Sequence, residues 1–169
     1  MKVEPQRKRG VGGLLARACV LAAATSSLAC PGAQVRPPKS QPCPPGAPEA
    51  LKELGILLAD EQVAAHVPGG DGGIARTRVR KGEVSYRLVY DLGRLPAGTL
   101  LQGQTYFGET RVYSRLTKAQ TPDWRIFPIC MVMVDRDDGR PGTPMQAGSE
   151  TDSAIIFSEV KARVVGSFD

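Results

Sequence analysis

The sequence predicts a mainly β protein: an antiparallel sandwich or small barrel with a short N-terminal helix. Apolar and polar side chains alternate with period two over several short stretches after residue 74, and turn residues separate these stretches. One stretch, 125–135, is apolar on both faces, as expected for a strand enclosed on both sides. Together these observations predict one β-rich domain over residues 48–169.

The helix is predicted at 48–54. Pro48 is acceptable at the first helical position, Glu49 suits the positive end of the helix dipole, and Gly55 can end the helix. The side chains expected on its buried face are Leu51, Leu54 and Leu58.

The strands that follow are assigned from their alternation. Residues 76–80 and 84–90 are predicted to pair as a hairpin around the turn Lys81-Gly82-Glu83. At the C-terminal end, residues 155–168 contain β-branched side chains that favour a strand over a helix.

The clearest prediction is a three-stranded meander over 99–107, 111–120 and 125–135. A tight turn after the first of these strands places Tyr106 opposite Tyr113, an aromatic pair that fixes strand register. The second turn, 121–124, has Pro at the position that a type I turn prefers. Pro128 cannot donate a ladder hydrogen bond, so a bulge or an exposed edge is expected there.

The N-terminal part is predicted to direct export. Basic residues at 2–9 precede an apolar, small-residue stretch at 11–29, so residues 1–29 are interpreted as a signal peptide. The cleanest apolar run, 18–24, is far shorter than the about 20 residues that a membrane-spanning helix needs. We therefore expect cleavage rather than a permanent membrane helix.

Cys30 is the predicted first residue of the mature chain. The tetrapeptide Ser27-Leu28-Ala29-Cys30 resembles the lipobox of bacterial lipoproteins, in which the Cys is acylated. That family prefers Leu where this chain has Ser27 and a small residue where it has Leu28. Small residues at 27 and 29 also suit the ordinary signal peptidase. We predict lipidation of Cys30, with simple secretion as the alternative.

A Pro-rich spacer is predicted over residues 30–47. Seven prolines lie between residues 31 and 48, and such a stretch stays extended instead of forming a core. If Cys30 carries lipid, Cys43 in the spacer and Cys130 form an even pair in an oxidising compartment, and a disulfide is the simplest interpretation. The alternative is a catalytic thiol at Cys130 with His66, the single His of the chain, as its base.

The net charge of +5 reflects the export segment. Residues 1–29 hold five Lys or Arg and one Glu, so the remainder holds 17 basic and 16 acidic residues and is almost neutral. Bulk charge therefore does not support a nucleic-acid partner.

The most distinctive surface motif is the arginine stripe Arg76, Arg78 and Arg80. Residues two apart lie on one face of a strand, so the three guanidinium groups could receive an anionic partner. The alternative is that these charges protect an edge strand from aggregation.

Three other motifs lack the spacing or the accompanying residues of the sites that they resemble. Asp135–Gly139 resembles a calcium loop, but its Gly comes one position early and residue 146 is Gln, so a solvated turn is expected. Ser158 and Lys161 match S-x-x-K without the further signatures of that enzyme class. The loop at 68–73 lacks the pattern of a phosphate-binding loop. No kinase, P-loop, triad or metal motif is found, and no cofactor is expected.

Several blocks of the mature chain are similar to a set of small, uncharacterised exported proteins, probable lipoproteins, that occur in many paralogous copies in some gliding soil bacteria. The blocks are Cys43-Pro-Pro-Gly-Ala, Gly93-Arg-Leu-Pro-Ala-Gly-Thr-Leu-Leu, Tyr106-Phe-Gly, Arg111-Val-Tyr, Leu116-Thr-Lys-Ala and Pro128-Ile-Cys-Met. The resemblance spans most of residues 43–168 and supports the Cys43–Cys130 pairing, but it implies no chemistry.

These observations favour a non-enzymatic cell-envelope lipoprotein. Its β-rich binding or structural domain is tethered through Cys30 to the outer membrane or within the periplasm, and a protein of the envelope is the expected partner. The alternatives are a small envelope hydrolase using carboxylates such as Asp91 or Glu109, and a periplasmic regulator associated with a signalling system.

Overall fold

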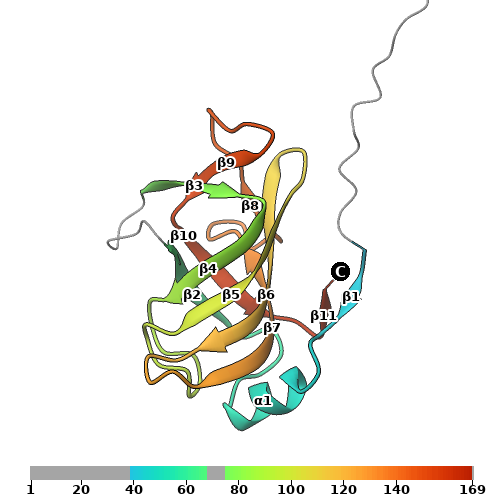
Figure 1. The fold of residues 1–169 in the computed structure, drawn as a ribbon, viewed down its shortest axis with the longest axis vertical. Coiled ribbons are helices and arrows are strands. Elements are labelled where there is room, and N and C mark those ends of the chain that lie inside the picture. The colour runs from blue at the N-terminus through green and yellow to red at the C-terminus, as the bar shows by residue number, and fades with distance from the viewer. Residues whose placement is uncertain (1–38, 68–74, 169) are drawn as a thin grey trace, which may run out of the picture. The chain divides into compact units, whose positions relative to one another are not determined.

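Six β-strands close into an antiparallel barrel in the computed structural model, which describes residues 39–67 and 75–168 (Figure 1). The order around the barrel is β5-β4-β2-β10-β7-β6, and pairing of β5 with β6 closes it. The strands are β2 (Glu61–Val67), β4 (Gly82–Leu88), β5 (Leu100–Phe107), β6 (Arg111–Gln120), β7 (Ile126–Val134) and β10 (Glu159–Val164). The mainly β class is confirmed, and the open choice between sandwich and barrel resolves to a barrel.

Smaller elements surround this barrel within the described residues. β3 (Arg76–Arg80) pairs with β9 (Ser153–Phe157), and β1 (Gln41–Pro42) pairs with β11 (Ser167–Phe168). The short β8 (Thr143–Pro144) pairs antiparallel with the first two residues of β6.

The predicted hairpin of residues 76–80 with 84–90 is wrong. β3 pairs with β9, and β4 pairs with β2 and β5. Gly82, at a positive φ of 108°, lets the chain turn from one sheet into the other. Val79 of β3 is buried in the same core cluster as Ala154 and Ile156, so apolar burial beside β9 replaces the local pairing.

The predicted meander is confirmed, with β5, β6 and β7 paired in sequence. Tyr106 lies opposite Tyr113 as expected. The register of β6 and β7 shifts between Leu116 and Lys118, where Lys118 pairs with Pro128 and Leu116 with Met131. One extra residue of β7 is therefore accommodated beside Pro128, which confirms the predicted bulge.

Helix α1 (Ala47–Glu53) confirms the predicted helix and begins one residue earlier. Its first turn contains Pro48 and Glu49, and Gly46 precedes it with a positive φ of 79°. Ala47 and Leu51 are buried, and α1 packs beside β7. Leu58, expected in the core, is 70% exposed because the chain leaves the helix before it.

Both ends of the described chain are fastened to the domain. A disulfide joins Cys43 to Cys130, with 5.3 Å between their Cα atoms. Strand β1 also lies inside the range predicted as spacer, 30–47, and pairs with β11. The predicted strand at 155–168 is divided into parts of β9, β10 and β11.

Across residues 39–67 and 75–168 we find no helix with the length and hydropathy required to traverse a bilayer.

Candidate functional site

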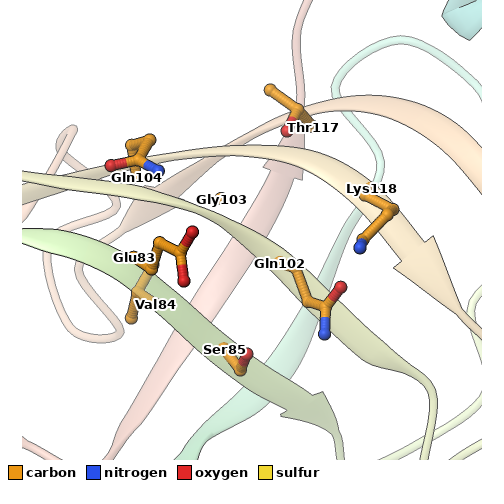
Figure 2. Close-up of a pocket in the computed structure, with 8 residues that line it drawn as sticks. All are labelled: Glu83, Val84, Ser85, Gln102, Gly103, Gln104, Thr117 and Lys118. Carbon is orange, nitrogen blue, oxygen red and sulfur yellow. The ribbon is translucent and has the colours of Figure 1, made fainter.

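An open, polar depression lies on the outer wall of the barrel, over β4, β5 and β6 (Figure 2). Its volume is about 400 Å³, at the lower end of the range for ligand sites. The residues around it are Glu83, Val84, Ser85, Gln102, Gly103, Gln104, Thr117 and Lys118. We take this depression as the candidate functional site.

Strand alternation directs the polar side chains into the depression. Val84 is buried in the barrel, so its neighbours Glu83 and Ser85 point to the outer face. Across the sheet Ser85 lies opposite Gln102, and Gln102 lies opposite Lys118. Three strands thus contribute one row of polar side chains.

A β-bulge shapes the depression. The register between β5 and β6 shifts between Gln102 and Gly103, and Thr117 is the residue left without a partner on β5. A Cβ at Gly103 would lie 1.9 Å from the Arg115 carbonyl oxygen, so only Gly permits this approach of the two strands. The bulge leaves Thr117 and Lys118 both exposed, where regular alternation would expose one.

Gln102 supplies an unsatisfied hydrogen-bonding group. Its Oε1 is buried and has no hydrogen-bond partner. Among the described residues it is the one buried side-chain nitrogen or oxygen atom of this kind. Figure 2 shows the Gln102 amide near the side chain of Lys118, with Glu83 farther away on β4. An unpaired buried acceptor costs about 1–3 kcal/mol, so turning the Gln102 amide toward a hydrogen-bond donor in the depression would recover that energy.

The chemistry of the depression is suited to binding. Glu83 only accepts hydrogen bonds at neutral pH, Lys118 only donates them, and the amides and hydroxyls do both. The two charges are of opposite sign, so the site carries no net charge. In the described part of the chain no group of three His, Cys, Asp or Glu side chains is arranged to hold a metal ion.

The arginine stripe lies elsewhere, on β3, and its three side chains are exposed. Arg78 donates a hydrogen bond from Nη1 to Ser153 Oγ at 2.7 Å and lies 3.7 Å from Glu150. β3 pairs only with β9 within the described residues, so it is an edge strand. Both interpretations of Arg76 and Arg80, a partner surface and edge protection, fit this placement.

Cys43 and Cys130 form the predicted disulfide, which leaves Cys130 without a free thiol for nucleophilic chemistry.

His66, the base considered for such a thiol, faces Tyr86 with 5.6 Å between ring centroids, and its Nδ1 lies 3.3 Å from Thr77 Oγ1. Burial lowers the pKa of His66 below its ordinary value. Cys30 and the loop at 68–73 lie outside the described residues.

The carboxylates suggested for a hydrolase are not brought together. Asp91 follows β4 and precedes β5, whereas Glu109 follows β5, so the two lie at opposite ends of that strand. Asp91 Oδ1 accepts a hydrogen bond from the Ala97 N–H at 2.7 Å, which gives it a role in its own loop.

The remaining motifs have structural explanations. Asp135 Oδ1 accepts hydrogen bonds from the backbone N–H groups of Asp137 and Asp138 at 2.9 and 3.0 Å, which forms a turn between strands as expected. Lys161 donates to Glu61 Oε1 at 2.9 Å. Ser158 is fully buried just before β10. Neither residue of the S-x-x-K match therefore has the setting of a catalytic group.

Two buried polar groups could not be assigned from the sequence. Tyr86 Oη lies 3.2 Å from Ser114 Oγ, which in turn lies 3.0 Å from Thr105 Oγ1, so a chain of hydroxyls runs inside the barrel. Burial raises the pKa of Tyr86 to about 12. The inward position of Ser114 and Thr105 follows from strand register, which the sequence pattern alone does not fix.

Arg115 is the second such group, 6% exposed on the outside of the barrel. Its Nη2 donates to the Lys39 carbonyl at 3.0 Å, and its guanidinium lies 5.5 Å from the ring centres of Tyr106 and Phe168. It therefore links both ends of the described chain to β6.

No family model matches the chain, and no curated protein matches it significantly.

Proposed function

We propose that this chain is a non-enzymatic cell-envelope lipoprotein whose barrel domain, tethered through Cys30, binds a polar ligand or partner group at the outer-wall depression. The polar depression around the unpaired Gln102 Oε1 is the observation that carries the binding role. The export segment and the resemblance of residues 27–30 to a lipobox support the tether. The Cys43–Cys130 disulfide is typical of an oxidising compartment and supports export.

The ligand group is expected to be neutral or zwitterionic and to carry hydroxyl or N–H donors. An anion with acceptors alone would leave Gln102 Oε1 unpaired and would approach the Glu83 carboxylate. Strand addition is not the expected mode of binding here, because Ser85, Gln102 and Lys118 each have a paired strand on both sides. Recognition would therefore use side chains rather than a free strand edge.

Capture from solubilised envelope tests the binding role. The bait is the mature chain, compared with Glu83→Gln and Gln102→Leu, and with Glu49→Gln on α1 as the matched control. We expect the same bound species with the mature chain and with the control, and its loss with both depression variants. Equal capture by all four baits, or by none, contradicts the proposal.

Intact mass of the protein isolated from the envelope tests the tether. We expect acyl mass on Cys30 and an increase of two protons on reduction. An unmodified Cys30 would remove the membrane anchor from the proposal and favour simple secretion.

A further inference from the structure

The exposed large hydrophobic side chains of the described residues gather at one end of the barrel. Antiparallel pairing places the start of β2, β5 and β7 and the end of β4, β6 and β10 at this end, together with α1 (Figure 1). We call it the α1 end. Its loops are 54–60, 89–99 and 121–125.

Every large apolar side chain that the described residues expose belongs to these loops or directly adjoins them. The exposed fractions are 70% for Leu57, 70% for Leu58, 36% for Val89, 61% for Tyr90, 78% for Trp124 and 59% for Ile126. The opposite end carries none of this group. Apolar side chains scattered singly need no explanation, but six at one end of a barrel indicate an interaction surface.

The three loops hold one another in place. The Arg94 N–H donates to the Leu54 carbonyl at 2.8 Å, which joins loop 89–99 to the end of α1. A Cβ at Gly98 would lie 3.6 Å from Pro122, so loop 89–99 also lies beside the 121–125 turn. The apolar side chains are therefore presented from one supported surface.

The chain reaches this end just before α1, after running along the barrel wall, where the Lys39 carbonyl accepts a hydrogen bond from Arg115 and β1 pairs with β11. Cys43 lines an apolar groove of about 270 Å³ together with Leu51, Leu57 and Leu58. Cys30 precedes Lys39, the first described residue, by nine residues, a stretch that spans at most about 30 Å when fully extended. An acyl chain on Cys30 would thus hold the α1 end within reach of the membrane.

We propose that the α1 end rests against the lipid bilayer that carries the Cys30 anchor. Trp124 and Tyr90 are amphipathic aromatic side chains of the type enriched at membrane interfaces. Leu57 and Leu58 would enter the acyl boundary, and the exposed Arg94 would reach lipid phosphates. The inference rests on the proposed anchor for its geometry, while the apolar surface itself is present without it.

Trp124 is the only Trp of the chain and reports directly on this contact. The mature chain carrying Cys30→Ser, which removes the acylation site, is mixed with vesicles of phosphatidylethanolamine and phosphatidylglycerol. We expect a blue shift of Trp124 emission and quenching by lipids brominated near the headgroup. The double variant Leu57→Ser with Leu58→Ser should bind about tenfold more weakly or worse, and the control Glu109→Ser with Thr110→Ser at the opposite end should bind as the parent does.

Three outcomes overturn the proposal. The first is an emission spectrum that vesicles leave unchanged, and the second is equal vesicle binding by the leucine variant and its parent. The third is a blue shift that depends on protein concentration without lipid, which would assign the surface to a second copy of the chain. The Cys30 mass measurement is independent, so failure of the anchor and failure of bilayer contact are distinguishable.

Discussion

Removing the Cys43–Cys130 disulfide should lower the free energy of unfolding of the domain by several kcal/mol. The bond connects residues 87 apart, and the chain-entropy model gives about 4–5 kcal/mol for a loop of this length. For a domain of this size about 3–5 °C of Tm corresponds to each kcal/mol, so replacing both cysteines by Ala should lower Tm by about 12–25 °C. Cys130 is 1% exposed, so Ala is a better replacement than Ser, whose hydroxyl would be buried.

Thermal unfolding followed by circular dichroism measures this effect, with Cys30→Ser in every protein to remove its thiol. The parent with reductant keeps both sulfur atoms but loses the covalent link, and so separates loop entropy from packing. Both the reduced parent and the Cys43→Ala, Cys130→Ala variant should lose Tm by similar amounts. A fall below about 3 °C in either would refute the loop-closure reasoning.

Three further effects follow from single side chains. Gln102→Leu should leave the urea unfolding free energy unchanged or raise it by about 1 kcal/mol, because it removes a buried acceptor that has no partner. Arg115→Lys should cost about 1–2 kcal/mol in the same assay, because an ammonium group cannot reproduce the planar contacts to two rings and the Lys39 carbonyl. Hydrogen bonds from Lys161 and Arg163 lower the pKa of Glu61 below 4.5, so its stabilisation is present above 4.5 and is lost as the pH falls through the folded-state pKa. The stability gap between the parent and Glu61→Gln should therefore narrow in acid.

Control substitutions and alternative outcomes distinguish these specific effects from a general loss of stability. Arg87 is exposed on β4, and Arg87→Lys should leave stability unchanged. A Gln102→Leu protein that loses more than about 1 kcal/mol would show that the Gln102 amide has partners in solution. A stability gap for Glu61→Gln that stays constant in acid would show that the Lys161 and Arg163 contacts do not depend on the charge of Glu61.

The parts of the fold that the sequence predicts are those set by local chemistry. Helix α1 follows from Pro48 and Gly55, and the meander follows from period-two alternation interrupted by tight turns. Pro128 predicted a bulge or an exposed edge, because a residue without an N–H cannot donate a ladder hydrogen bond, and the structure has the bulge. The disulfide followed from the even number of cysteines left after the export segment and Cys30 are set aside.

The sequence-based predictions are wrong or incomplete for strands whose partners lie far away in the chain. β3 has the alternation expected of a hairpin partner for β4, but β4 is already flanked by β2 and β5. β2 itself went unrecognised, because Glu61–Val67 contains two alanines and little of the β-branched content that marks a strand. Its place is decided by pairing with β10, nearly a hundred residues away.

Only one feature of the candidate site, the glycine within β5, could be predicted from the sequence. Glu83, Gln102 and Lys118 are ordinary outward-facing polar residues, and strand register alone brings them together. A signal was nevertheless present at Gly103, because an isolated Gly within a strand indicates a bulge or a close backbone approach. The structure shows both at that position.

The two proposed surfaces are compatible because they occupy different faces of one barrel. The apolar side chains are confined to the α1 end, whereas the depression opens on the wall formed by β4, β5 and β6. A barrel that rests on the bilayer through its α1 end would keep this wall and the arginines of β3 exposed to the envelope space. Bilayer contact would also limit rotation about the tether and reduce the orientational freedom lost when a partner binds. Substitution of Leu57 and Leu58 should therefore weaken partner capture by the lipidated protein on vesicles and leave capture by the Cys30→Ser protein in solution unchanged.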